Sequence, residues 1–73
     1  MKRAIPHHDL ETVRERMASD SLSIVEVEKI IHDTLEEAMQ AVDFEDWAVA
    51  SERFQFLADA TRWALGRIED ALR

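Results

Sequence analysis

The chain has 73 residues, a formal net charge of −7, no cysteine, one glycine and one proline. A single domain of this length buries only about 60% of the surface of its unfolded chain, so a lone monomer would have marginal stability. The absence of cysteine excludes disulfides and thiolate metal sites. The abundance of Ala, Leu, Glu and Arg predicts an all-α fold without a sheet.

The negative charge is concentrated in one interval, between Lys29 and Arg53, which contains seven acids and no Lys or Arg. Outside it, nine acids balance nine bases. The chain therefore has no excess of positive charge with which to neutralise phosphates, and we expect no direct binding of nucleic acid. No apolar run approaches the roughly 18 residues of a membrane span. We expect a cytoplasmic protein that does not enter a membrane.

A short arm and a short helix begin the predicted order of elements. Residues 1–5 are predicted to be a flexible arm, and residues 6–73 a single helical domain. The first helix is expected at about 6–18, with Pro6 in its first turn and Asp9 as an alternative N-cap. Its apolar face is formed by Leu10, Val13 and Met17.

The second helix is expected at about 23–42. Ser23 and Glu26 have the spacing of a capping box, which marks a helix start. The residues that follow keep one face apolar for about five turns, and this face requires a partner helix. Its members are Ile24, Val27, Ile31, Leu35, Ala38 and Val42, with Ile30 and Met39 beside them.

The third helix is expected at about 44–72, with Asp43 as its N-cap, and is predicted to form an antiparallel hairpin with the second. Apolar or small residues recur along it at alternating spacings of three and four, typical of an a/d seam. A single continuous helix remains an alternative, because Val42, Val49, Phe56 and Trp63 are each seven residues apart. Charged residues, Glu45 or Asp46 and Glu52 or Arg53, would interrupt the seam of such a helix, which favours the hairpin. The seam consists of Trp47, Ala50, Phe54, Leu57, Thr61, Ala64, Ile68 and Ala71.

A second apolar line on the third helix is the first candidate functional surface. It lies about 145° around the axis from the a/d seam, so one partner helix cannot cover both. The first helix, a second copy of the chain or a foreign protein could cover it, and coverage by the chain itself or by a second copy is favoured. The predicted partner or dimer interface comprises Val49, Phe56, Ala60 and Trp63 together with Leu10, Val13 and Met17. The predicted architecture is therefore a short helix and a long hairpin that pair into a homodimeric bundle.

An acidic tip of the hairpin is the second candidate surface. Glu36 and Glu37 lie toward the end of the second helix, where the helix dipole disfavours anions. Acids placed against the dipole suggest a use, such as docking on a basic protein surface that normally holds nucleic acid, although a solubilising role is the commoner explanation. The tip comprises Glu36, Glu37, Asp43, Glu45 and Asp46.

One stripe of the second helix could bind a divalent metal ion, because Glu28, His32 and Glu36 follow one another at intervals of four. The spacing differs from the Glu-x-x-His pairs of helical carboxylate metal sites, so we predict ordinary charge pairs and no metal or other cofactor. The chain also has no cysteine nucleophile, Gly-rich phosphate loop or Gly-x-Ser-x-Gly motif. It is not predicted to be an enzyme.

These observations predict a small acidic protein that acts by binding another protein. We expect a regulator or inhibitor of the kind encoded by short bacterial or phage reading frames. Two alternatives stay open: a metal-binding bundle or small enzyme subunit that uses Glu28, His32 and Glu36, and a structural assembly subunit.

Overall fold

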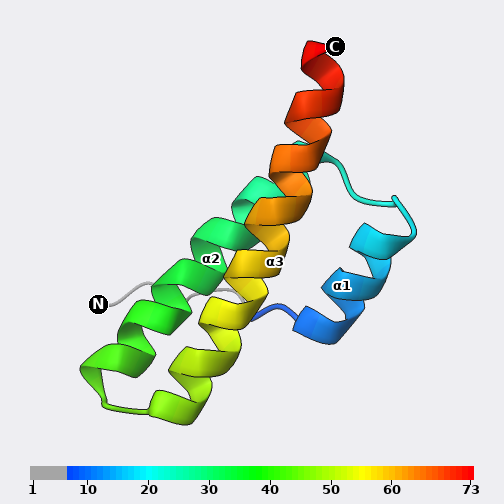
Figure 1. Ribbon diagram of the computed structural model, residues 1–73. Coiled ribbons are helices and arrows are strands. Elements are labelled where there is room, and N and C mark those ends of the chain that lie inside the picture. The colour runs from blue at the N-terminus through cyan, green and yellow to red at the C-terminus, as the bar shows by residue number, and fades with distance from the viewer. Residues whose placement is uncertain (1–6) are drawn as a thin grey trace.

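The computed structural model describes residues 7–73, which form three α-helices and no β-strand (Figure 1). Helix α1 spans Leu10–Ala18, α2 spans Ile24–Asp43 and α3 spans Trp47–Leu72. The predicted all-α class is confirmed, with 82% of the described residues in helices. The flexible arm predicted for residues 1–5 lies outside the described part of the chain, and α1 begins at Leu10 instead of Pro6.

Helices α2 and α3 lie side by side and run in opposite directions, and α1 packs beside α3 (Figure 1). Residues 44–46 separate α2 from α3, so the two do not form one continuous helix. The last turns of α3 project beyond the start of α2 (Figure 1). A Cβ at Gly66, in this projecting end, would meet nothing within 4 Å, so close packing does not require the glycine. None of the helices in residues 7–73 is long and apolar enough to cross a membrane.

Each helix starts at a side chain that accepts hydrogen bonds from free backbone N–H groups. Asp9 accepts from Thr12 and Glu11, and the backbone hydrogen bond from Thr12 is the largest influence that lowers the pKa of the Asp9 carboxyl. Ser23 accepts from the Glu26 N–H at 3.2 Å and donates its hydroxyl to the Glu26 carboxylate at 3.1 Å. Asp46 accepts from the Val49 N–H at 3.3 Å. The predicted N-cap at Asp43 is therefore wrong, because Asp43 is the last residue of α2.

Helix α2 ends in a Schellman motif, which accounts for the later start of α3. The Asp46 N–H donates to the Ala41 carbonyl oxygen at 2.8 Å, and the Glu45 N–H donates to that of Val42 at 3.0 Å. This pattern places Glu45 in the left-handed region, with φ of 56°. Helix α1 ends in the same way, with Asp20 at φ of 62°. Acidic residues thus occupy both positions where glycine is usual.

The core lies where α1 and α2 both meet α3. It contains side chains from all three helices and from the α1–α2 connection, and Ile31 and Trp63 pack against its edge. Thr34 is also fully buried, on the side of α2 that faces α3. The core cluster consists of Leu10, Val13, Met17, Leu22, Val27, Ile30, Phe56 and Ala60.

We predict that Glu45→Gly raises the free energy of unfolding by about 1 kcal/mol, because glycine adopts φ of 56° without the steric cost of a Cβ. Urea unfolding followed by circular dichroism measures the change. Glu36→Gly is the matched control, since Glu36 lies exposed inside α2, where glycine lowers stability by about 1 kcal/mol. Equal destabilisation by both substitutions would contradict the left-handed turn.

Thr34 provides a second test of the fold, because its hydroxyl is fully buried and has no hydrogen-bond partner. Thr34→Val keeps the shape of the side chain and removes the unsatisfied group, so it should raise the free energy of unfolding by about 1 kcal/mol. Thr34→Ser keeps the hydroxyl and deletes the methyl group, and it should destabilise the protein. The two variants are compared by thermal unfolding, and a loss of stability with valine would show that the hydroxyl is satisfied.

Candidate interaction surface

The second apolar line of α3 faces α1 and lies in the core of the single chain. Phe56 and Ala60 are fully buried, Trp63 packs against them, and Leu10, Val13 and Met17 belong to the same cluster. Val49 is half-buried and lies outside this cluster. The sequence allows the first helix, a second copy or a foreign protein to cover this line, and in the structure α1 covers it. Apart from Val49, these side chains form internal packing of the single chain.

Polar contacts also hold α1 on this side of α3. The Trp63 indole Nε1–H donates to the Met17 carbonyl oxygen at 3.2 Å. The Arg67 guanidinium lies 5.1 Å from the centre of the Trp63 ring and pairs with Asp20 at 2.6 Å. In the middle of α1, Arg14 lies 5.4 Å from the centre of the Phe56 ring and pairs with Asp59 at 3.3 Å. An arginine therefore lies over the ring of each of these two aromatic residues of α3. Each arginine also forms an ion pair that links α3 with α1 or with the residues that follow α1.

Most of the bulky residues of the predicted a/d seam are exposed. Ala50 and Leu57 are buried, whereas Trp47, Phe54 and Ile68 are exposed. On α2 the buried positions are largely those of small residues, among them Thr34, Ala38 and Ala41. Small side chains thus supply much of the buried surface of α2, together with Val27 and Ile30, while Phe56 belongs to the core cluster that α1 shares. The remaining seam residues Thr61 and Ala71 are exposed and Ala64 is half-buried.

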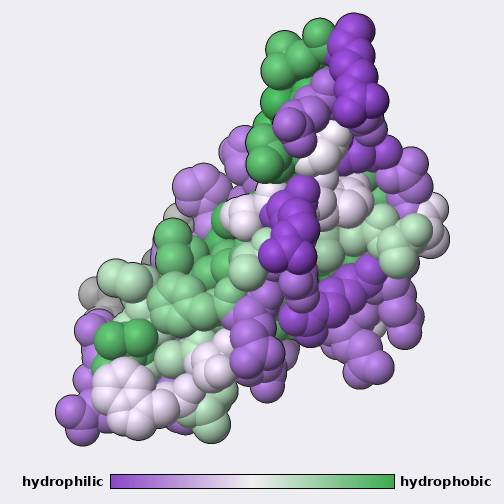
Figure 2. All heavy atoms as spheres, in the orientation of Figure 1, coloured by the Kyte–Doolittle hydropathy of each residue, from purple (hydrophilic) through white to green (hydrophobic). Residues whose placement is uncertain are grey.

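Exposed large side chains of α2 and α3 form an apolar surface that we call the open face. Leu35, Met39 and Val42 lie within about 60° of one another around α2, at about 100° per residue. Its five α3 residues also fall within about 60° of one another around their helix. Figure 2 shows apolar side chains over α2, α3 and the projecting end of α3 on one side of the molecule. The open face comprises Leu35, Met39, Val42, Trp47, Phe54, Leu65, Ile68 and Leu72, all of which are exposed.

Some acidic residues of the predicted tip form ion pairs or cap a helix within the chain, and the others do neither. Glu37 is 17% exposed, lies 3.1 Å from the Arg53 Nε and 3.6 Å from the His7 Nδ1, and so belongs to an ion-pair network. Asp46 is the N-cap of α3. Within residues 7–73, Glu36, Asp43 and Glu45 are exposed and make no ion pair. These three residues form the exposed part of the tip.

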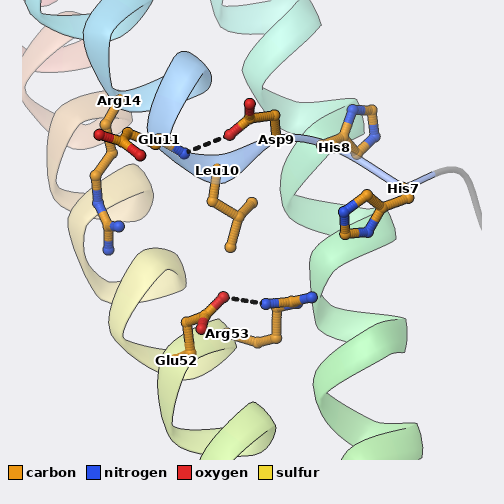
Figure 3. Close-up of a pocket in the computed structure, with 8 residues that line it drawn as sticks. All are labelled: His7, His8, Asp9, Leu10, Glu11, Arg14, Glu52 and Arg53. Atoms are coloured by element: carbon orange, nitrogen blue, oxygen red, sulfur yellow. Dashed lines mark hydrogen bonds and ion pairs between the residues drawn. The ribbon is translucent and has the colours of Figure 1, made fainter.

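A polar depression lies where the segment before α1 passes α2 and α3 (Figure 3). His7, His8, Arg14 and Arg53 line it together with acidic residues. Arg53 pairs with Glu52 and with Glu37, Arg14 pairs with Asp59, and the His8 Nε2 lies 2.8 Å from an Asp33 oxygen. Each of these side chains has a carboxylate partner, so the depression presents no spare positive charge. Sequence reasoning misses the His8–Asp33 contact, because no local pattern relates residues 25 positions apart.

The candidate metal-binding stripe is a solvent-exposed surface of α2. Glu28, His32 and Glu36 are all exposed. No group of three or more His, Asp or Glu side chains among residues 7–73 is arranged to hold a metal ion.

Comparisons of the chain with protein-family models, with curated protein sequences and with solved structures find no significant match. Function is therefore inferred from the surfaces described above.

The different positions of the two tryptophans give a test of the α1 contact. Trp63→Phe should lower the free energy of unfolding by about 1–2 kcal/mol, because it removes the hydrogen bond to Met17 and part of the packing in the core. Trp47→Phe is the control and should change stability by less than about 0.5 kcal/mol, since the Trp47 side chain is exposed. Chemical unfolding at low protein concentration measures both, and equal losses would argue against α1 packing on Trp63.

Proposed function

We propose that this protein is a small acidic regulator or inhibitor that performs no catalysis and acts by binding a basic partner protein. The observation that carries the proposal is the exposed part of the acidic tip, Glu36, Asp43 and Glu45, and the open face supplies a second site of association between chains. The chain covers one side of α3 with α1 and leaves eight large apolar side chains of α2 and α3 exposed on another side. Contiguous apolar surface of this kind marks sites of association between protein chains. Pairing of two chains into a homodimeric bundle would use this surface.

The exposed part of the acidic tip gives the chemistry of the partner. Glu36 and Asp43 are seven residues apart and lie on the side of α2 that is turned away from α3, and Glu45 follows in the turn. None of the three takes part in an ion pair of the described chain. Such a cluster attracts basic surfaces and accelerates encounter with them, including surfaces that otherwise hold nucleic acid.

Two other functions receive less support. A metal-binding or catalytic bundle would need Glu28, His32 and Glu36 to meet further ligands, and the fold leaves these residues on exposed α2 surface. A structural assembly subunit would use the same open face and would be distinguished by growth beyond a dimer. The tip charges favour a regulator, because they form an exposed acidic surface that would attract a basic protein.

Charge reversal at the tip tests this proposal. Immobilised wild-type protein should retain a basic protein from an extract of its source cells, and Asp43→Lys should lower that retention at least about tenfold, with wild-type binding weakened by salt. A lysine at Asp43 also suits the end of α2, so the fold is preserved. Glu15→Lys, an equal reversal on the exposed side of α1, is the control. Retention that survives Asp43→Lys, or that falls equally with Glu15→Lys, would contradict docking through the tip.

A further inference from the structure

We propose that two copies of this chain pair through the open face, with their α3 helices antiparallel and with the twofold axis level with residues 59 and 60. The proposal specifies the occupant of the open face, and in this sense it rests on the proposed function. It is carried by a second line of α3 residues at alternating spacings of four and three. The line consists of Trp47, Ser51, Phe54, Ala58, Thr61, Leu65, Ile68 and Leu72, all of them exposed.

This line is complementary to itself when one copy is reversed. Setting Trp47 opposite Leu72 places Phe54 opposite Leu65, so that a large side chain faces a large one at each end. A shift by one heptad in either direction leaves Trp47 or Leu72 without an opposite residue on α3. The single register that pairs all eight positions thus places large apolar side chains opposite each other in two of its four kinds of contact. Its contacts are Trp47 with Leu72, Ser51 with Ile68, Phe54 with Leu65 and Ala58 with Thr61, each formed twice.

The centre of the pairing tolerates close approach and burial. Ala58 is small, which allows two helix backbones to come near each other. The Thr61 Oγ1 donates to the Leu57 carbonyl oxygen at 2.7 Å within its own helix. The hydroxyl is therefore already satisfied, and covering it leaves no polar group without a partner.

Charge is also compatible with the antiparallel arrangement. The exposed positions beside the line are Ala48, Gln55, Arg62 and Glu69. In the proposed register Arg62 faces Gln55 and Glu69 faces Ala48 of the other copy, so no like charges meet. The two acidic tips lie at opposite ends of the pair, whereas a parallel arrangement would place them together and make them repel.

The exposed apolar area is that of a dimer interface. Trp47 is 62% exposed, Leu65 56% and Leu72 81%. An aromatic side chain exposes about 150–250 Å² when uncovered and an aliphatic one somewhat less, so the eight exposed residues of the open face present on the order of 800 Å² per chain. A stable interface of standard size buries about 800 Å² on each partner. Leu65, Ile68 and Leu72 lie toward the projecting end of α3, and in the pair they would lie over the tip half of the other copy.

Light scattering over a concentration series is the first arm of the test. Wild-type protein should have the mass of a dimer, and Leu65→Glu should raise the dissociation constant by about a hundredfold or more, because the change occurs twice in each dimer. Leu65 is half-exposed in the single chain, so this variant should keep its helical circular dichroism. Val25→Glu places the same charge on an exposed apolar residue outside the open face and should remain a dimer.

Engineered disulfides test the register in a chain that has no natural cysteine. Ser51→Cys combined with Ile68→Cys should give a covalent dimer on mild oxidation. Ser51→Cys alone should not, because the position is about 25 Å along the axis from its equivalent in the other copy of the antiparallel pair, at 1.5 Å per residue. A covalent dimer from the single variant, or none from the double variant, would overturn the register.

A monomeric wild type, or a dimer that Leu65→Glu leaves intact, would overturn the pairing itself. Neither result affects capture of a basic protein through Asp43, so failure of this inference is distinguishable from failure of the proposed function.

Discussion

The packing of α1 on Phe56 and Ala60 is the contact on which the rest of the structure depends. A single partner helix cannot cover two sides of α3, and α1 supplies the second cover from only nine residues. The Trp63 hydrogen bond to Met17 fixes the end of α1 on the same side. Phe56 is fully buried in the cluster that α1 completes, whereas Trp47 and Phe54 on the same helix are exposed. One orientation of α3 thus produces both the core and the open face.

The all-α class and two of the helix starts could be predicted because they depend on short-range sequence patterns. Asp9 and Ser23 cap helices through bonds to residues two or three positions away. The predicted turn between α2 and α3 is misplaced because Asp43 and Asp46 are both suitable N-caps. What decides between them is the pair of hydrogen bonds from Glu45 and Asp46 back to α2, and these require a left-handed glutamate that no residue preference predicts.

The open face could not be identified from periodicity, because periodicity does not say which neighbour covers a line. The residues Trp47, Phe54, Thr61 and Ile68 belong to two lines at once. One line continues through Ala50 and Leu57, and the other through Ala58 and Leu65. The first is the more apolar pattern and predicts the whole contact with α2, whereas the position of α1 in space leaves the second line exposed. The packing of α1 on α3 is a contact between residues far apart in the sequence, and a seven-residue repeat carries no information about it.

The division of the acids follows from the same geometry. Asp33, Glu37 and Glu52 pair with His8 or Arg53, and Asp46 is used as a cap, so the fold consumes four of the seven acids between Lys29 and Arg53. The other three lie on the outer side of α2 and in the turn, away from the core. A charge buried within an apolar interface would lose its hydration without a partner. Because Glu36, Asp43 and Glu45 are exposed at one end of the molecule, a chain that pairs along α3 keeps its acidic tip in water and accessible to a second, basic protein.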